Sequence, residues 1–147
     1  MDTRYTKKLT TYEELDTILP MIEKFHETQA FRRFFPYSGH LLWLTVNFPC
    51  LGIWAGYERT KQGDLPLGYV IVAVQYQECR KEALIYEAYS EAKDLGLSRV
   101  VFDEIEKWAK EQGCTLLSAF TAHGKVADFI SRQYGFTEQR TYFTKLL

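Results

Sequence analysis

Apolar residues in the first fifty positions follow helical spacing twice, after a short strand-like start. Residues 4–10 alternate like a strand, and apolar positions three or four apart then predict a helix that begins at a capping box over residues 11–14. Because Pro20 lacks a backbone donor, that helix either kinks or divides into two pieces. Ser38 is expected to cap a second helix over residues 39–46, which is apolar nearly all round and should therefore be buried.

The next segment carries the pattern of an antiparallel sheet. Three apolar runs are separated by polar, turn-forming residues. The runs cover residues 51–57, 67–76 and 82–89. We expect them to form three consecutive antiparallel strands, with reversals at residues 60–64 and 78–81.

The remaining apolar pattern predicts a crossover and a closing strand. Helical spacing over residues 98–112 ends at Gly113, and a continuous apolar run follows over 115–122, as expected for a central parallel strand covered on both faces. Strand, helix and parallel strand together predict a right-handed crossover. Helical spacing returns over residues 125–134, and partial alternation over 137–147 predicts a last strand.

The turn between the strand at residues 82–89 and the helix at 98–112 is a predicted anion site. The backbone N–H groups at the start of a helix have no partner within the helix, and the positive end of the helix dipole lies there. A phosphorylated ligand is therefore expected to bind at this turn.

Length, charge and hydropathy then limit the class of protein. The 147 residues fit one domain. The 18 basic and 19 acidic side chains include no basic run, so we exclude nucleic acid as the primary ligand. No apolar stretch approaches the about 18 residues of a membrane span, and the first residues lack the pattern of a signal peptide. We expect a cytoplasmic protein.

The three cysteines lack the spacing of a metal site. Cys50, Cys79 and Cys114 each lie beside an apolar run, so we expect them to be reduced and packed as small apolar side chains. No metal site is predicted.

The order of elements resembles the GNAT superfamily of acyl-CoA N-acyltransferases over nearly the whole chain. Its local anchors are the strand-to-turn segment at residues 90–98 and the segment at 127–136, which ends in Gly-Phe. The resemblance implies an α/β fold of the α+β kind. It consists of a mixed sheet with antiparallel N-terminal strands, a β-α-β crossover and helices on both faces, in a single domain over residues 1–147.

The resemblance also implies how acetyl-CoA or another acyl-CoA binds. Lys93, Gly96 and Ser98 occupy the main positions of the family's acyl-CoA loop, whose backbone N–H groups hold the pyrophosphate. Ala88 would face the thioester carbonyl as an oxyanion donor, and Ser90 the pantetheine arm. The full set of implied loop contacts is Lys93, Asp94, Leu95, Gly96, Leu97, Ser98 and Arg99.

Acyl transfer to an amine needs a base, because the amine is protonated at neutral pH. Glu82 stands where many members of the family carry a glutamate base, and Glu87 is a second candidate. The two-residue period of a strand places them on opposite faces unless a bulge intervenes, as it does in the family. Ser131 stands where the family commonly has the tyrosine that protonates the departing thiolate, and the nearest tyrosine is Tyr134.

Three further features remain open. His123 follows the parallel strand, where ligands of open sheets gather, and either contacts the acceptor or cofactor or is a loop residue. His26 and His40 are expected at the surface or at helix ends. The aromatic cluster over residues 31–37 either packs in the core or lines an acceptor pocket, as the corresponding loop does in the family.

The leading interpretation is therefore an N-acetyltransferase that moves an acyl group directly from CoA to an amine. The acceptor is a small-molecule or protein amine: a polyamine, an aminoglycoside-like compound, an amino acid, or the lysine or N-terminus of a protein. Arg32 and Arg33 favour an anionic or carboxylate-bearing partner. The alternative is a catalytically silent GNAT-fold protein with a structural or regulatory binding role, which Ser98 and Ser131 favour.

Overall fold

The computed structural model describes residues 3–28, 36–91, 99–119, 132 and 135–137. Within these residues the helices and strands follow one another in the predicted order. They are β1 (Arg4–Lys8), α1 (Tyr12–Thr28), α2 (Tyr37–Asn47), the short 3-10 helix η2 (Phe48–Cys50), β2 (Gly52–Thr60), β3 (Gly63–Gln77), β4 (Arg80–Ser90), α3 (Arg99–Glu111) and β5 (Leu116–Ala119).

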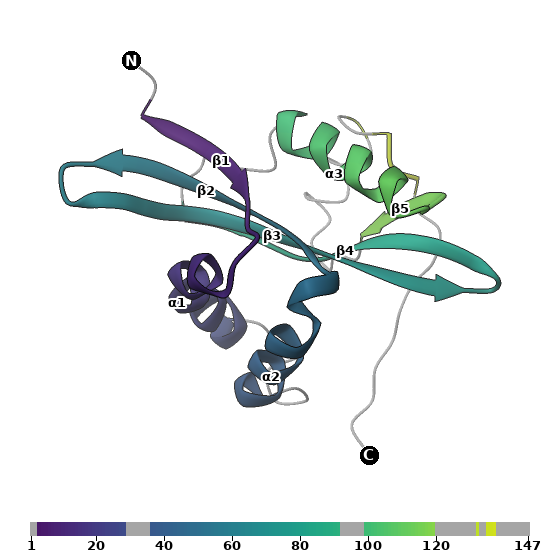
Figure 1. The fold of residues 1–147 in the computed structure, drawn as a ribbon, viewed down its shortest axis with the longest axis horizontal. Helices are drawn as coiled ribbons and strands as arrows, with labels where there is room; N and C mark the ends of the chain where they lie inside the picture. Colours follow the sequence, from purple (N-terminus) through teal and green to yellow (C-terminus); the bar gives the residue numbers. More distant parts are fainter. Residues whose placement is uncertain (1–2, 29–35, 92–98, 120–131, 133–134, 138–147) are drawn as a thin grey trace.

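The described strands form one mixed sheet in the order β1-β2-β3-β4-β5 (Figure 1). Each strand from β1 to β4 is antiparallel to the next, whereas β5 is parallel to β4. The antiparallel prediction and the β-α-β connection through α3 are thus confirmed. The β3–β4 reversal takes only two residues, Glu78 and Cys79, both with positive φ, as a tight two-residue hairpin turn requires.

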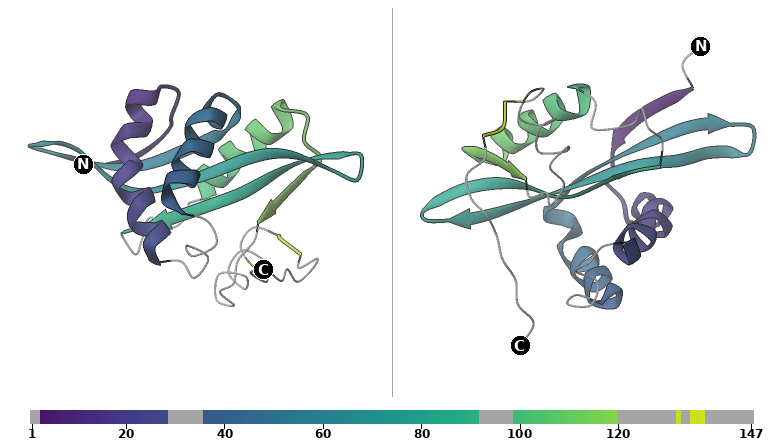
Figure 2. Two further views of the ribbon diagram at one scale, coloured as in Figure 1. Left: turned by 90° about the horizontal axis from the view of Figure 1, so that it is seen from below. Right: turned by 180° about the vertical axis from the view of Figure 1, so that it is seen from behind.

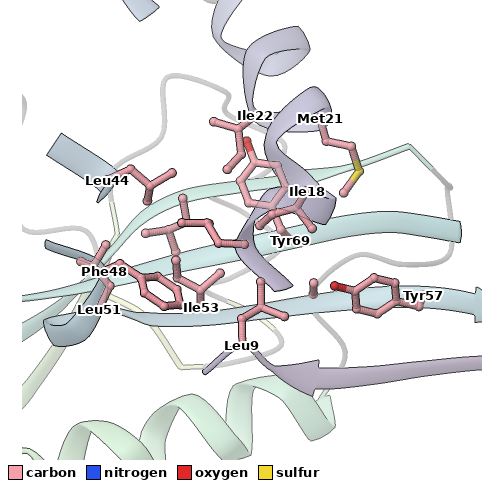
Figure 3. Packing of buried hydrophobic residues seen from close by; sticks show 13 residues of the cluster. Leu9, Ile18, Met21, Ile22, Leu44, Phe48, Leu51, Ile53, Tyr57 and Tyr69 are labelled. Carbon is pink, nitrogen blue, oxygen red and sulfur yellow. The ribbon is translucent and has the colours of Figure 1, made fainter. Parts of the chain in front are cut away.

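Helices cover both faces of the sheet, as predicted (Figure 2). Helices α1 and α2 pack on one face through Ile18 and Leu44 (Figure 3). Both side chains are fully buried, as is Ile71 of β3 in the same cluster. Helix α3 packs on the other face through Phe102 and Ile105. A fully buried aliphatic or aromatic side chain stabilises a fold by about 1.5–3 kcal/mol, so these two layers hold the sheet between them. Among the described residues, no helix has both the length and the apolar character of a membrane span.

The first helix begins at the predicted capping box. The Glu14 carboxylate accepts the backbone N–H groups of Thr10 (3.1 Å) and Thr11 (3.2 Å), while the Glu14 N–H donates to Thr11 Oγ1 at 3.2 Å. Lys7 Nζ lies 2.7 Å from the same carboxylate. The hydrogen bond and ion pair with Lys7, and then the Thr10 N–H, hold the pKa of Glu14 down to about 2.

Replacing Glu14 by alanine should lower the free energy of unfolding by about 1 kcal/mol at pH 7. Because the folded-state pKa of Glu14 is depressed, its contribution is present above the ordinary glutamate pKa and is lost as the pH falls towards 2. Urea unfolding at several pH values measures the difference from wild type. The matched control is Glu13→Ala in the same exposed first turn. A Glu14→Ala difference as large at pH 2 as at pH 7 would contradict this assignment.

Pro20 lies inside a single helix, so the alternative of two separate helices is wrong. Pro20 is exposed, so the backbone carbonyl that would have accepted its N–H lies on the solvent side of the helix. That carbonyl can turn towards water, and the helix therefore continues through the proline. On the opposite side, Ile18 and Ile22 are fully buried against the sheet and hold both halves of the helix in line.

Two predictions for the second helix are also wrong. Helix α2 begins at Tyr37, two residues earlier than predicted, and Pro36 rather than Ser38 is its N-cap, without a side-chain hydrogen bond. The helix is not buried on all sides, since Leu42 and Val46 are 66% and 68% exposed. Helix α1 and the sheet cover only one side of α2. Because α2 carries apolar residues on its other sides as well, some of them stay exposed.

Two smaller expectations need correction. Cys50 and Cys79 are exposed rather than packed as small apolar side chains, because they lie at the end of η2 and in the β3–β4 turn. The predicted stop of helix α3 (Arg99–Glu111) is confirmed, since Gly113 follows it with a φ of 83°. Strand β5 is not covered throughout, since Leu116 at its start is 40% exposed.

Several predicted segments lie outside the described residues. They are the acyl-CoA loop at residues 93–98, most of the aromatic cluster at 31–37 with Arg32 and Arg33, His123, Ser131, and most of the last helix and last strand.

Candidate active site

A bulge in β4 determines how the two candidate glutamates are arranged. Ile71 of β3 pairs with Glu87, whereas the next residue, Val72, pairs with Ile85, so Tyr86 is an extra residue in β4. Glu82 pairs with Gln75, which is four residues from Ile71 and therefore on the same face of β3. The bulge expected from the resemblance is present, and it brings Glu82 and Glu87 to the same face of the sheet.

The carboxylate of Glu82 is fully engaged with neighbouring strands. Glu82 is 1% exposed, and one of its oxygens accepts a hydrogen bond from Gln75 Nε2 on β3. The other accepts from Ser118 Oγ on β5 at 3.2 Å. Glu82 therefore links three adjacent strands at the point where β4 and β5 pair.

Glu87 is equally buried but has a different environment. It is 6% exposed, and its Oε2 lies 3.5 Å from Nε2 of His40 on α2, which is 9% exposed. Burial raises the pKa of the nearby Tyr69 hydroxyl well above its ordinary value, and the Glu87 carboxylate adds to that shift. In the described part of the chain, Glu87 Oε2, His40 Nε2 and Tyr69 Oη have no partner within hydrogen-bond geometry.

Aromatic rings surround the His40–Glu87 pair. The ring of His40 is nearly parallel to that of His26, with centroids 5.6 Å apart, and to those of Trp43 and Tyr86, each at 6.0 Å. Trp43 and Tyr86 stack on each other at 4.6 Å. Tyr86 is 48% exposed, so the group of rings extends from the buried pair to the surface.

Among the described residues, β4 extends further than its ladder with β5. The ladder between them joins Glu82–Ile85 to Leu116–Ala119, but β4 continues to Ser90. The backbone N–H of Glu91 donates to the backbone carbonyl of Leu67 on β3. Along an antiparallel strand, successive N–H groups point alternately to one neighbouring strand and to the other. The N–H groups of Ala88 and Ser90 therefore point away from β3, towards the side of β5. This is the orientation that the predicted thioester and pantetheine contacts need.

Among the predicted phosphate contacts, Arg99 is the one within the described residues. It is the first residue of α3, and its Nε lies 3.2 Å from Asp103 Oδ1 on the exposed side of the helix. Its place at the helix start agrees with a role beside an anion, because the orphan N–H groups of the first turn lie there.

Three solved structures illustrate the architecture that this chain shares. An aminoglycoside acetyltransferase from an uncultured soil metagenomic sample, in complex with trehalose, has a TM-score of 0.68 and 18% identity, over 99% of this chain and 97% of that chain. The ribosomal-protein-alanine N-acetyltransferase from Brucella melitensis biovar Abortus 2308 has a TM-score of 0.66 and 12% identity, over 97% and 99%. The aminoglycoside N-acetyltransferase AAC(6')-Iy, in complex with CoA, has a TM-score of 0.65 and 10% identity, over 97% and 99%.

This chain has the GNAT fold. At identities of 10–18% the likeness is one of fold, and it agrees with the mixed sheet of the five described strands. No family profile matches the sequence, and no curated protein matches it significantly.

Within this GNAT fold, the structure brings together residues that the sequence did not single out. His26 and His40 lie near helix ends, as predicted, but they are buried rather than at the surface. Trp43, Tyr69 and Tyr86 complete the cluster around Glu87. A signal was available for His26, which continues the helical spacing of buried residues Leu15, Ile18 and Ile22. No such signal links His40 to Glu87, because the contact is between distant segments.

Proposed function

We propose that this protein is an acyl-CoA-dependent N-acyltransferase, most simply an N-acetyltransferase, that transfers the acyl group directly to an amine. The observation that carries the proposal is the end of β4 beyond the bulge. There the backbone donors of Ala88 and Ser90 point to the side of β5, while Glu87 lies buried on the face covered by α1 and α2. The CoA-bound neighbour supports an acyl-CoA ligand for this fold.

The donor set fits an acyl-CoA. Acetyl-CoA would supply a thioester carbonyl that is activated for attack. The backbone N–H of Ala88 can donate to the thioester carbonyl oxygen, and that of Ser90 to an amide of the pantetheine arm. The first turn of α3 can bind the pyrophosphate through its backbone N–H groups. The proposed phosphate contacts remain residues 93–99.

Each residue then has a defined task in the proposed reaction. Glu87, with His40 beside it, takes a proton from the acceptor amine, which makes its nitrogen nucleophilic. The N–H of Ala88 donates to the carbonyl oxygen as negative charge develops there, an interaction worth roughly 3 kcal/mol when the donor is preorganised. Ser131 and His123 stay candidates for protonating the thiolate and contacting the acceptor. Glu82 stays a candidate base by resemblance, although its hydrogen bonds favour a structural role.

Isothermal calorimetry with acetyl-CoA tests the first step, and we expect saturable binding. ATP is the matched control for nonspecific nucleotide binding, because it shares the adenine and phosphates but lacks the pantetheine arm. Absence of both heat and thermal shift at millimolar acetyl-CoA would overturn the enzyme proposal. That result would favour the alternative of a catalytically silent binding protein with the same fold.

A further inference from the structure

Three polar side-chain atoms at the β4 bulge form no hydrogen bond within the part of the chain that the structure describes, although two of them, Glu87 Oε2 and His40 Nε2, lie 3.5 Å apart. They are Glu87 Oε2, His40 Nε2 and Tyr69 Oη, from residues that are 6%, 9% and 4% exposed. Buried polar atoms in proteins nearly always have a partner, and an exception at one place indicates a missing ligand or water. Because the three atoms come from β4, α2 and β3, the fold holds them together by its packing rather than by a local turn.

All three atoms can accept a hydrogen bond. The Glu87 carboxylate and the Tyr69 hydroxyl accept directly, and neutral His40 accepts at Nε2 when its proton is on Nδ1. A primary ammonium ion has three N–H donors and no acceptor. The number and kind of groups in the cluster therefore match a primary ammonium.

The charge around the cluster favours a cation. The Glu87 carboxylate raises the pKa of Tyr69 and Tyr86, after burial itself, and contributes to the raised pKa of Tyr37. Tyr37 is also shifted by Glu23, an exposed carboxylate on α1. Negative potential thus acts both inside the cluster and at its edge, and it stabilises a bound positive charge.

The rings at the edge suit the same ligand. Trp43 and Tyr86 are stacked at 4.6 Å and connect the buried pair to the surface. The faces of tryptophan and tyrosine attract cations and contact apolar chains equally well. They therefore offer a path along which an alkylammonium ion can reach Glu87.

We propose that Glu87, His40 and Tyr69 bind the acceptor as a primary ammonium ion, and that the acceptor class is cationic primary alkylamines rather than carboxylate-bearing amino acids. This inference rests on the proposed acyl transfer and names its acceptor. Trp43 and Tyr86 flank the alkyl chain. Arg32 and Arg33, which favoured an anionic partner by sequence, lie outside the described residues, whereas the cluster is built from described ones.

The proton balance follows from this arrangement. One proton of the ammonium moves to the Glu87–His40 pair, and the lone pair left on nitrogen forms the new N–C bond while the C–S bond breaks. A second proton leaves the nitrogen for the thiolate, which becomes the free CoA thiol. The third stays in the product amide.

Two measurements test the proposal. The first is the equilibrium binding of n-butylammonium, monitored by NMR with CoA-loaded and with CoA-free protein. Glycine and N-methylbutylammonium are the comparison compounds. The second is acetyl transfer to the same amines at saturating acetyl-CoA. We expect n-butylammonium to have an affinity and a kcat/KM at least about tenfold higher than either comparison compound. N-methylbutylammonium has one N–H donor fewer, and glycine would bring a carboxylate without a partner into the site.

The variant Tyr69→Phe removes one acceptor and keeps the ring. It should raise both the dissociation constant and the KM of n-butylammonium about tenfold, without changing the KM of acetyl-CoA. The matched control is Tyr76→Phe in the β3–β4 hairpin, where the side chain is 77% exposed. Unchanged amine affinity in both Tyr69→Phe and Glu87→Gln, with acetyl-CoA binding intact, would overturn the ammonium site and leave the acyltransferase standing.

A preference for glycine would likewise overturn the acceptor class. If wild-type protein does not bind acetyl-CoA but binds n-butylammonium in a way that depends on Tyr69, the ammonium site is supported and the acyltransferase proposal is overturned. Absence of amine binding in wild-type protein, with or without CoA, would mean that the three polar atoms surround a structural water.

Discussion

Replacing Glu87 by glutamine should lower kcat for acetyl transfer about 100-fold or more. Glutamine keeps the shape of the side chain and the rings around it but cannot take a proton, and general-base catalysis contributes about 10²–10⁴ in rate. Steady-state rates at saturating acetyl-CoA measure the effect on kcat, and calorimetry should show that acetyl-CoA still binds.

Glu111→Gln is the matched control for the loss of one negative charge, since Glu111 is exposed at the far end of α3. Glu82→Gln is the informative comparison within the site. It removes an acceptor from Gln75 or Ser118, so we expect it to reduce stability by about 1–3 kcal/mol. If kcat falls about 100-fold in Glu82→Gln and not in Glu87→Gln, the roles assigned to the two glutamates are reversed.

Replacing Ile105 by alanine should lower the free energy of unfolding by about 2–5 kcal/mol. Ile105 is 0% exposed and packs from α3 onto the sheet, where it is part of the same cluster as Trp54 and Phe102. The substitution removes apolar contacts and leaves a cavity between two layers that are fixed by other residues. Equilibrium unfolding in urea, followed by tryptophan fluorescence and by circular dichroism, measures the loss.

The control for Ile105 is Val100→Ala on the same helix, because Val100 is 66% exposed. Its expected effect is within about 0.5 kcal/mol. Equal losses in the two variants would mean that helix propensity, rather than packing against the sheet, determines how strongly α3 stabilises the fold.

Local signals in the sequence predicted most of the described elements. The capping box at Thr11 and Glu14 located the start of α1 because its hydrogen bonds join residues three apart. Gly113 located the end of α3 because a φ of 83° is costly for other residues. Apolar runs between turn residues predicted β2, β3 and β4 as antiparallel neighbours, and the order of elements carried the resemblance to GNAT proteins.

The errors have one physical origin, which is that burial depends on neighbours from distant parts of the chain. Leu42 and Val46 are exposed because nothing in the described part of the chain covers that side of α2. His40 is buried because α2 crosses β4 at Glu87, 47 residues further on. Neither outcome is encoded in the residues next to these positions.

The sequence by itself determined the order of elements, because that order depends on local periodicity, turns and capping. The order carried the resemblance to GNAT proteins, and that resemblance implied the class of fold and the candidate glutamates. Only the tertiary structure showed how the environments of the two glutamates differ. The extra residue in β4 turned both to one face, and strand pairing then gave Glu82 two hydrogen bonds while α2 brought His40 to Glu87. A bulge and a helix–sheet contact depend on how distant segments pack together. The cluster of Glu87, His40 and Tyr69 could therefore be recognised only in the tertiary structure.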